Sequence, residues 1–136
     1  MGQQELWFGG RSQSTIWQID GIESRDEQPG VKPVEHVERA VKNSSQSGGV
    51  VVDLFGGTGT TLIACERTQR LARVMESEPA YVDLIVRRWQ QLTGKSAILD
   101  GHGKAFDEIT EIRGQANLSK NQWMTWSPNA TKKRKN

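Results

Sequence analysis

The sequence predicts a three-layer α/β/α fold in which a parallel sheet of about three strands lies between helices. Two observations support this prediction. Short apolar runs alternate with stretches of helical periodicity, an order that is typical of parallel sheets. A segment rich in glycine and threonine, Asp53 to Thr61, directly follows the first of these runs. Parallel sheets bind ligands at this position, beyond the carboxyl ends of their strands.

Three short apolar runs are the expected strands, over residues 50–54, 71–75 and 96–100. The first is continuously apolar and is bounded by glycines, as expected for a strand that is buried on both faces. We expect an additional strand ahead of them at residues 14–19. With helices between the strands, this order predicts a parallel sheet whose strands are joined by right-handed crossover connections.

Helical periodicity fills the intervals between these runs. One helix is expected from Pro33, because proline suits a first helical position and three valines then recur on one face. A second helix is expected over about residues 60–68. A third starts at Pro79, continues with apolar residues at helical spacing and is closed by Gly94.

The composition describes one ordinary globular domain of 136 residues, with 35% hydrophobic and 25% charged residues. No apolar run approaches the roughly 20 residues that span a bilayer, so no membrane partner is expected. Cys65 is the one cysteine, which excludes an internal disulfide and is typical of a reducing compartment. We therefore expect a cytoplasmic protein in which Cys65 is a small buried residue.

Charge is distributed unevenly along the chain. No acidic residue follows Glu111, and residues 132–135 read Lys-Lys-Arg-Lys. We predict an N-terminal strand and linker over residues 1–27, a ligand-binding domain over 28–112, and a polar basic tail over 113–136. The tail is expected to be disordered. A basic end of this kind also suits a phosphate backbone, and the two interpretations are compatible.

The glycine segment narrows the class of ligand. A nucleoside triphosphate loop requires a lysine after its glycines, and no lysine occurs between Asp53 and Arg67. A dinucleotide loop requires three glycines in the pattern Gly-x-Gly-x-x-Gly. Gly57 and Gly59 fit that pattern, but Leu62 occupies the third position. A nicotinamide-dependent oxidoreductase is therefore a weak alternative.

S-adenosylmethionine is the third candidate ligand. Its carboxylate and ammonium would lie against the glycine segment, and its ribose hydroxyls need an acceptor. Glu76, at the end of the second expected strand, is placed to accept both hydroxyls. Asp53, at the end of the first, can face the ammonium directly or through water. A solvated acid at the strand end is the alternative for Glu76.

Three motifs resemble those of the amino-directed DNA methyltransferases. Residues 53–61, Asp-Leu-Phe-Gly-Gly-Thr-Gly-Thr-Thr, are similar to that family's Asp-Pro-Phe-x-Gly-Ser-Gly-Thr-Thr. The family's upstream His-Pro-Thr-Gln-Lys-Pro is matched at Pro29, Lys32 and Pro33. Residues 76–82 are similar to its Glu-x-x-Pro-x-Tyr-Val. The three motifs occur in the family's order, which makes the resemblance more specific than a single glycine loop.

The resemblance implies a partial Rossmann-like methyltransferase fold and an S-adenosylmethionine-dependent, site-specific DNA methyltransferase of a restriction–modification system. Such enzymes act on double-stranded DNA, at adenine N6 or cytosine N4. Core packing is an equal alternative for Phe55. The residues that the resemblance and the loop together place around the cofactor are Lys32, Pro33, Asp53, Phe55, Gly57, Gly59, Thr60 and Glu76.

The family's catalytic segment, Asp/Asn/Ser-Pro-Pro-Tyr/Trp, has no counterpart in the chain. Residues 127–129, Ser-Pro-Asn, are a chance likeness within the polar tail. No catalytic residue is therefore predicted. The resemblance implies the C-terminal, cofactor-binding portion of the subgroup in which the catalytic half comes first, as a truncated gene or as half of a split enzyme. A separate chain with the catalytic half, or a homo-oligomer, would cover the edge of strand 50–54.

The sequence leaves other functions open. The chain can be a catalytically inactive fragment, or a non-enzymatic module that binds DNA or protein through Trp123, Trp126 and the basic end. His36 and His102 receive no role, and no metal-binding residues are predicted.

Overall fold

The computed structural model describes residues 7–10, 12–18 and 32–118. Its contacts divide the chain into two units, one ending at Lys95 and the other starting at Ser96. The first unit contains the sheet and the glycine segment, and it is therefore the unit that matters for a ligand.

Two parallel strands form the sheet of the first unit. Strand β1 (Val50–Asp53) pairs with β2 (Leu71–Val74) in a register that places Val50 beside Leu71 and Asp53 beside Val74. Both strands occur where the apolar runs predict them, and their parallel direction is confirmed. Their carboxyl ends therefore lie at the same edge of the sheet.

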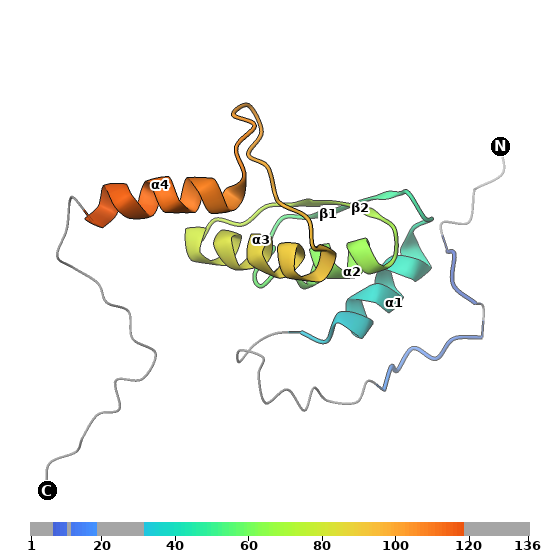
Figure 1. The fold of residues 1–136 in the computed structure, drawn as a ribbon. Coiled ribbons are helices and arrows are strands. Elements are labelled where there is room, and N and C mark those ends of the chain that lie inside the picture. Colours follow the sequence, from blue (N-terminus) through green and yellow to red (C-terminus); the bar gives the residue numbers. More distant parts are fainter. Residues whose placement is uncertain (1–6, 11, 19–31, 119–136) are drawn as a thin grey trace, which may run out of the picture. The chain divides into compact units, whose positions relative to one another are not determined.

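Three helices lie on one side of this sheet (Figure 1): α1 (Val34–Ser44), α2 (Thr60–Arg67) and α3 (Pro79–Thr93). Helix α2 is central, because it contacts α1, β2 and α3. The buried apolar side chains come from these helices, and they are Val41, Ile63, Ala64, Cys65 and Ile85. All three helices agree with the sequence expectation, as does the burial of Cys65.

Local sequence signals define the ends of these helices. Pro79 occupies the first turn of α3. N–H groups in the first turn have no partner within the helix, so the missing N–H of proline costs no hydrogen bond there. Gly94 closes the helix with a positive φ of 67°. Gln69, in the turn between α2 and β2, also has a positive φ, of 60°. Its carbonyl accepts a hydrogen bond from the N–H of Gly48 at 2.7 Å, which joins this turn to the one before β1.

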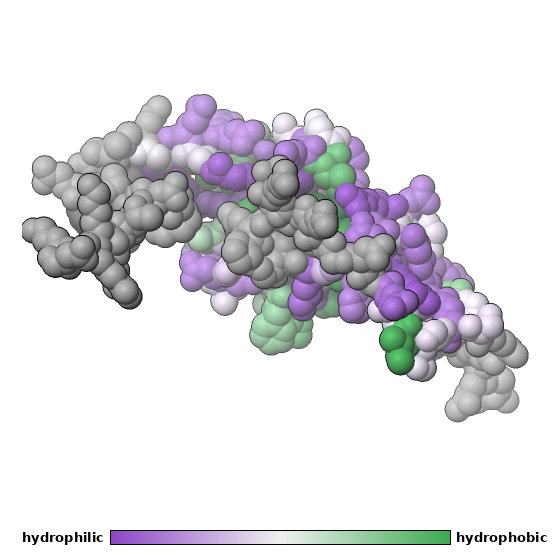
Figure 2. Space-filling view, turned by 90° about the horizontal axis from the view of Figure 1, so that it is seen from below, coloured by the Kyte–Doolittle hydropathy of each residue, from purple (hydrophilic) through white to green (hydrophobic). Residues whose placement is uncertain are grey.

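In the first unit, one helix layer covers one face of a two-stranded parallel sheet, and the expected second helix layer stays a prediction. Alternate residues of both strands are exposed. The surface on the helix side is mostly hydrophilic among the described residues, with hydrophobic residues in small separate areas (Figure 2).

The second unit corrects the expectation of a third parallel strand over residues 96–100. Ile98 instead pairs with Ala105 in an isolated antiparallel bridge. The intervening turn contains Gly101 and Gly103, which have φ values of 77° and 64°. The chain therefore turns back locally, and residues 96–100 form no regular strand.

Helix α4 (Phe106–Leu118) follows this turn. It continues past residue 113, where the sequence shows no further periodicity and predicts the start of a polar tail. The rest of that tail, including Trp123, Trp126 and the basic cluster, lies outside the described residues. No described helix is long and apolar enough to cross a membrane.

The expected strand at residues 14–19 is also wrong as far as residue 18, the last described residue of this segment. This segment and the described residues before it contact α1 instead. The backbone N–H of Phe8 donates to the Asn43 carbonyl at 2.8 Å. The guanidinium of Arg39 lies 4.7 Å from the ring centroid of Trp17, a cation–π contact.

Candidate cofactor site

The glycine segment forms a tight loop between β1 and α2, at the carboxyl edge of the sheet. The N–H of Gly56 donates to the Met75 carbonyl at 2.8 Å, which ties the loop to the end of β2. The N–H of Gly59 donates to the Gly56 carbonyl, also at 2.8 Å. Gly57 and Gly59 have φ values of 52° and 82°, which favour glycine. The loop therefore depends on glycine for its backbone conformation.

The three glycines of the loop differ in their surroundings. A Cβ atom on Gly56 would lie 2.5 Å from Val74 Cγ1, and one on Gly59 would lie 2.9 Å from Ile85 Cγ1. A Cβ atom on Gly57 would meet only the Phe55 carbonyl oxygen, at 4.0 Å. Gly56 and Gly59 thus allow close packing on β2 and α3, whereas Gly57 faces open space where a ligand can approach.

Asp53 organises the first part of the loop. Its Oδ1 accepts a hydrogen bond from the Phe55 N–H at 3.0 Å, and its Oδ2 accepts one from the Thr61 hydroxyl at 2.6 Å. Both carboxylate oxygens are therefore engaged within the loop. A carboxylate oxygen has two lone pairs, so each can still accept a further hydrogen bond.

Glu76 connects the loop to the start of α3. Its Oε1 accepts a hydrogen bond from the Glu78 N–H at 2.9 Å, and its Oε2 accepts one from the Gly57 N–H at 2.7 Å. These backbone donors, Glu78 first and then Gly57, lower the pKa of the Glu76 carboxyl below its usual value. Glu76 is therefore ionised at neutral pH and lies directly beside the open part of the loop.

The other predicted cofactor residues differ in their placement. Phe55 is 87% exposed, so it does not pack in the core of this unit. Thr60 is buried at the first position of α2. Lys32 is exposed and Pro33 is half-buried, and both directly precede α1.

The first turns of α1 contact the far end of α2. Glu38 and Glu35 lie 3.4 and 4.0 Å from the Arg67 guanidinium. These contacts orient α1 by its packing on α2. The place of Lys32 and Pro33 beside a cofactor stays a prediction.

Three residues that support the loop were not predicted as site residues. Thr61 binds Asp53, and Ile85 packs against Gly59. Arg88 donates from its guanidinium to the Thr58 carbonyl and so binds the loop from α3. Thr61 belongs to the recognised motif, whereas no local pattern indicates that Ile85 and Arg88 reach the loop.

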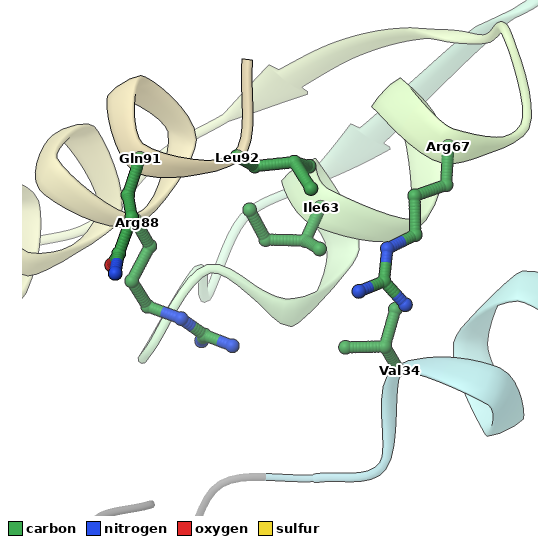
Figure 3. Close-up of a pocket in the computed structure, with 6 residues that line it drawn as sticks. All are labelled: Val34, Ile63, Arg67, Arg88, Gln91 and Leu92. Carbon is green, nitrogen blue, oxygen red and sulfur yellow. The ribbon is translucent and has the colours of Figure 1, made fainter. Parts of the chain in front are cut away.

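A groove on the helix side lies next to this support (Figure 3). Its lining residues are Val34, Ile63, Arg67, Arg88, Gln91 and Leu92. Both guanidiniums of the groove have partners, since Arg88 binds the Thr58 carbonyl and Arg67 lies against Glu38. We therefore place the candidate cofactor site at the carboxyl edge of the sheet instead, where Glu76 meets Gly57.

The family of the chain follows from comparison with known proteins. The sequence profile of the N6/N4 methylases, described as "DNA methylase", matches residues 5–87. The chain belongs to this family. The matched region includes the glycine loop, Glu76 and the first part of α3.

Curated relatives are type II methyltransferases of bacteria. M.BglI of Bacillus subtilis is 32% identical over 81 residues, which are 60% of this chain and 23% of the relative. M2.MboI of Moraxella bovis is 29% identical over 89 residues, which are 62% of this chain and 33% of the relative. The chain thus spans about a quarter to a third of the length of these methyltransferases.

Two solved structures of this class also resemble the chain. A putative DNA modification methylase of Thermus thermophilus, complexed with S-adenosyl-L-methionine, is 44% identical, with a TM-score of 0.46 over 50% of this chain and 29% of that one. The cytosine-N4-specific PvuII DNA methyltransferase is 28% identical, with a TM-score of 0.45 over 64% of this chain and 27% of that one.

Within the described residues, no three His, Cys, Asp or Glu side chains are grouped to hold a metal ion.

Proposed function

We propose that this chain is the S-adenosylmethionine-binding portion of a DNA methyltransferase that acts on adenine N6 or cytosine N4 within double-stranded DNA. The observation that carries the proposal is the Glu76 carboxylate, held beside the open glycine loop in a member of the N6/N4 DNA methylase family. The complex formed by a relative supports the choice of cofactor.

The residues at the carboxyl edge of the sheet fit the chemistry of this cofactor. Glu76 is ionised and retains lone pairs that can accept the ribose hydroxyls. Asp53 supplies negative charge for the ammonium of the methionine end, and the glycine backbone allows close approach. Phe55 offers an exposed aromatic ring. When bound, the cofactor supplies an electrophilic methyl group.

We assign further positions to the same cofactor. Gly57 and Gly59 shape the loop, and Thr60 begins the helix that follows it. Lys32 and Pro33 belong to the segment that we expect to cover the methionine end. None of these residues activates the base, and the Pro-Pro-aromatic segment that does so in the family is absent from the sequence. We therefore assign cofactor binding, and no catalytic residue, to this chain.

In our proposal, the order of the motifs makes this chain the C-terminal portion of the enzyme. It would belong to the subgroup of the family in which the catalytic half precedes the cofactor loop. The catalytic residues and the contacts that choose between adenine and cytosine would then come from the part of the enzyme that these 136 residues do not contain.

A calorimetric titration of the whole chain with S-adenosylmethionine, beside NAD, tests the proposal. We expect saturable binding of S-adenosylmethionine and none of NAD. Substitution of Glu76 alone is ambiguous, because this carboxylate also holds the Gly57 N–H. The titration is therefore repeated with a cofactor analogue that lacks both ribose hydroxyls, against the wild type and against Glu76→Gln.

Combining the analogue that lacks the ribose hydroxyls with the Glu76→Gln variant separates the role of Glu76 in ribose binding from its role in supporting the loop. In the wild type, loss of the hydroxyls should weaken binding by about 10- to 100-fold, as expected for hydrogen bonds to a charged acceptor. The loss should be much smaller in Glu76→Gln. Glu78→Gln, which removes the same charge two residues away, should behave as the wild type. An equal loss in the wild type and Glu76→Gln would assign Glu76 to the loop alone, and a folded chain without affinity would refute the proposal.

A further inference from the structure

Helix α3 contacts the glycine loop at two neighbouring points. Ile85 packs on Gly59, where an added Cβ atom would lie 2.9 Å from Ile85 Cγ1. One turn later in the helix, the Arg88 guanidinium donates a hydrogen bond to the Thr58 carbonyl. Residues three apart in a helix lie on the same face. This face of α3 therefore meets the loop with one apolar contact and one charged hydrogen bond.

The Thr58 carbonyl belongs to a tight turn of four residues. The N–H of Gly59 closes this turn by donating to the Gly56 carbonyl at 2.8 Å. The peptide group between Thr58 and Gly59 is therefore held on both sides, because its carbonyl binds Arg88 and its N–H binds Gly56. It cannot rotate without breaking two hydrogen bonds.

The backbone around this peptide has little restraint of its own. Gly57 and Gly59 flank Thr58, with φ values of 52° and 82°. Glycine adopts positive and negative φ about equally readily, so neither residue fixes the backbone by its own preference. The hydrogen bond from Arg88 therefore supplies a restraint that the glycine-rich loop lacks.

The restrained turn includes the part of the loop that lies beside Glu76. The Gly57 N–H donates to Glu76 Oε2 at 2.7 Å. Gly57 is also the glycine whose Cβ position faces open space. Because Thr58 directly follows Gly57, a rotation of the Thr58 carbonyl would alter the backbone next to this N–H and next to the open space.

We propose that Arg88 is a positioning residue of the cofactor site. By holding the Thr58 carbonyl, it keeps the backbone at Gly57 in the conformation that binds S-adenosylmethionine. Arg88 acts through the loop and does not itself contact the cofactor. This inference rests on the proposed function and adds a residue of α3 to the same site.

The electrostatic surroundings of Arg88 limit what its contact contributes to stability. Thr58 directly precedes Gly59, the N-cap of α2, so the guanidinium lies near the N-terminus of that helix. The helix dipole places partial positive charge there, which opposes a cation. The first turn of α2 contains no acidic residue that would offset it. The side chain is half-buried, and the partial loss of its hydration also costs free energy. We therefore expect its removal to affect cofactor affinity more than stability.

Arg88→Met tests the proposal, because methionine keeps an unbranched apolar stem and removes the guanidinium. The whole chain is titrated with S-adenosylmethionine by calorimetry. We expect the Kd to rise by about 10-fold, as when the conformation that binds falls to about a tenth of the population. Arg88→Lys should recover part of this loss, since its ammonium also donates to a carbonyl.

Arg39→Met is the matched control. Arg39 is also a half-buried arginine of the first unit, and it donates to Gln13 Oε1 at 3.3 Å and lies over the ring of Trp17. Its substitution removes the same charge and a hydrogen bond whose partner lies outside the glycine loop. The Kd should stay unchanged in this variant. The midpoint of urea unfolding should fall only slightly in both Arg39→Met and Arg88→Met.

Hydrogen exchange without cofactor tests the restraint itself. In Arg88→Met, the amides of Gly57 and Gly59 should exchange faster than in the wild type, because the turn that holds them is released. The amides of Ala64 and Cys65, in the buried part of α2, should keep their wild-type rates. A contact that only stabilised the unit would change both groups of amides together.

Four outcomes would overturn the proposal. The first is an unchanged Kd in a folded Arg88→Met variant, and the second is equal weakening by Arg39→Met. The third is an Arg88→Lys variant that binds no better than Arg88→Met. The fourth is exchange in Arg88→Met that is unaltered at the loop or accelerated equally in α2. A folded wild type that does not bind S-adenosylmethionine would refute the proposed function, and the exchange rates would then decide whether Arg88 restrains the loop.

Discussion

At the scale of single residues, the two glycines with positive φ in the loop have different neighbours, and they should differ in their tolerance of a side chain. Gly59→Ala should lower the free energy of unfolding by about 3 kcal/mol, because it combines an unfavourable φ with overpacking against Ile85. Gly57→Ala should cost about 1 kcal/mol, since its Cβ meets open space. Urea unfolding measures both.

Gly94→Ala is the control for the cost of φ alone. Gly94 has a φ of 67° and no atom near its Cβ position. Its substitution should therefore resemble that of Gly57. Equal destabilisation by Gly59→Ala and Gly57→Ala would show that Ile85 yields and that packing does not require glycine at position 59.

The carboxylate of Glu76 should make the stability of the loop depend on pH. Its pKa is lowered in the folded chain by the N–H groups of Glu78 and Gly57. Glu76 therefore stabilises the fold above the ordinary carboxyl pKa of about 4.3, and this contribution is lost as pH falls through the lowered folded value.

Glu76→Gln isolates this contribution. The wild type should be more stable than the variant at neutral pH, and the difference should shrink in acid, where the carboxyl becomes protonated. Urea unfolding across this pH range measures the difference. Glu108→Gln, in the second unit, controls for the loss of one negative charge. A difference that stays constant with pH would contradict the assignment.

At the scale of elements, α1 holds the segment of residues 12–18 through a pair of amides. The side chains of Gln13 and Asn43 each donate to the other, at 3.0 and 2.9 Å, and Asn43 is buried. Gln13→Ala should lower the free energy of unfolding by about 1–3 kcal/mol, because the buried side-chain amide of Asn43 loses both of its hydrogen bonds to Gln13.

Hydrogen exchange can locate this effect. Amides of residues 12–18 should exchange faster in Gln13→Ala than in the wild type. Gln46→Ala changes an exposed glutamine of the turn after α1 and should leave exchange unchanged. Unaltered exchange in Gln13→Ala would mean that other contacts hold the segment.

The sequence correctly predicted the elements whose signals are local. It failed where pairing with another segment of the chain determines the structure. Pro79 and Gly94 mark the ends of α3, and periodicity predicts its length. Residues 96–100 have a strand-like composition, yet they form no regular strand. Gly101 and Gly103 allow a tight turn, so Ile98 pairs with nearby Ala105 instead. A short apolar run does not specify which edge it will join.

At the scale of the whole molecule, the elements around the candidate cofactor site all belong to the unit that ends at Lys95. A chain of residues 1–95 should therefore keep its cooperative unfolding and its affinity for S-adenosylmethionine. Its free energy of unfolding should change by less than about 1 kcal/mol. For a chain of this size, a change of about 1 kcal/mol shifts the midpoint of thermal unfolding by about 4–8 °C.

A shorter truncation provides the contrast. Removal of all residues after Glu78 deletes α3 and with it the buried Ile85, which packs on Gly59. That chain should lose cooperative unfolding. If the chain of residues 1–95 also lost it, the second unit would be required for folding of the first.

The sequence by itself determined the family motifs, the glycine loop and the positions of β1, β2 and the first three helices. These features depend on neighbours along the chain: periodicity, prolines, glycines and the spacing of the motif residues.

The tertiary structure alone decided how those parts meet. It showed that Asp53 and Glu76 bind the backbone of the loop, that Phe55 is exposed, and that helices cover one face of the sheet. Such features depend on which surfaces come together and on the donors that lie within hydrogen-bond reach, and no local pattern in the chain encodes either.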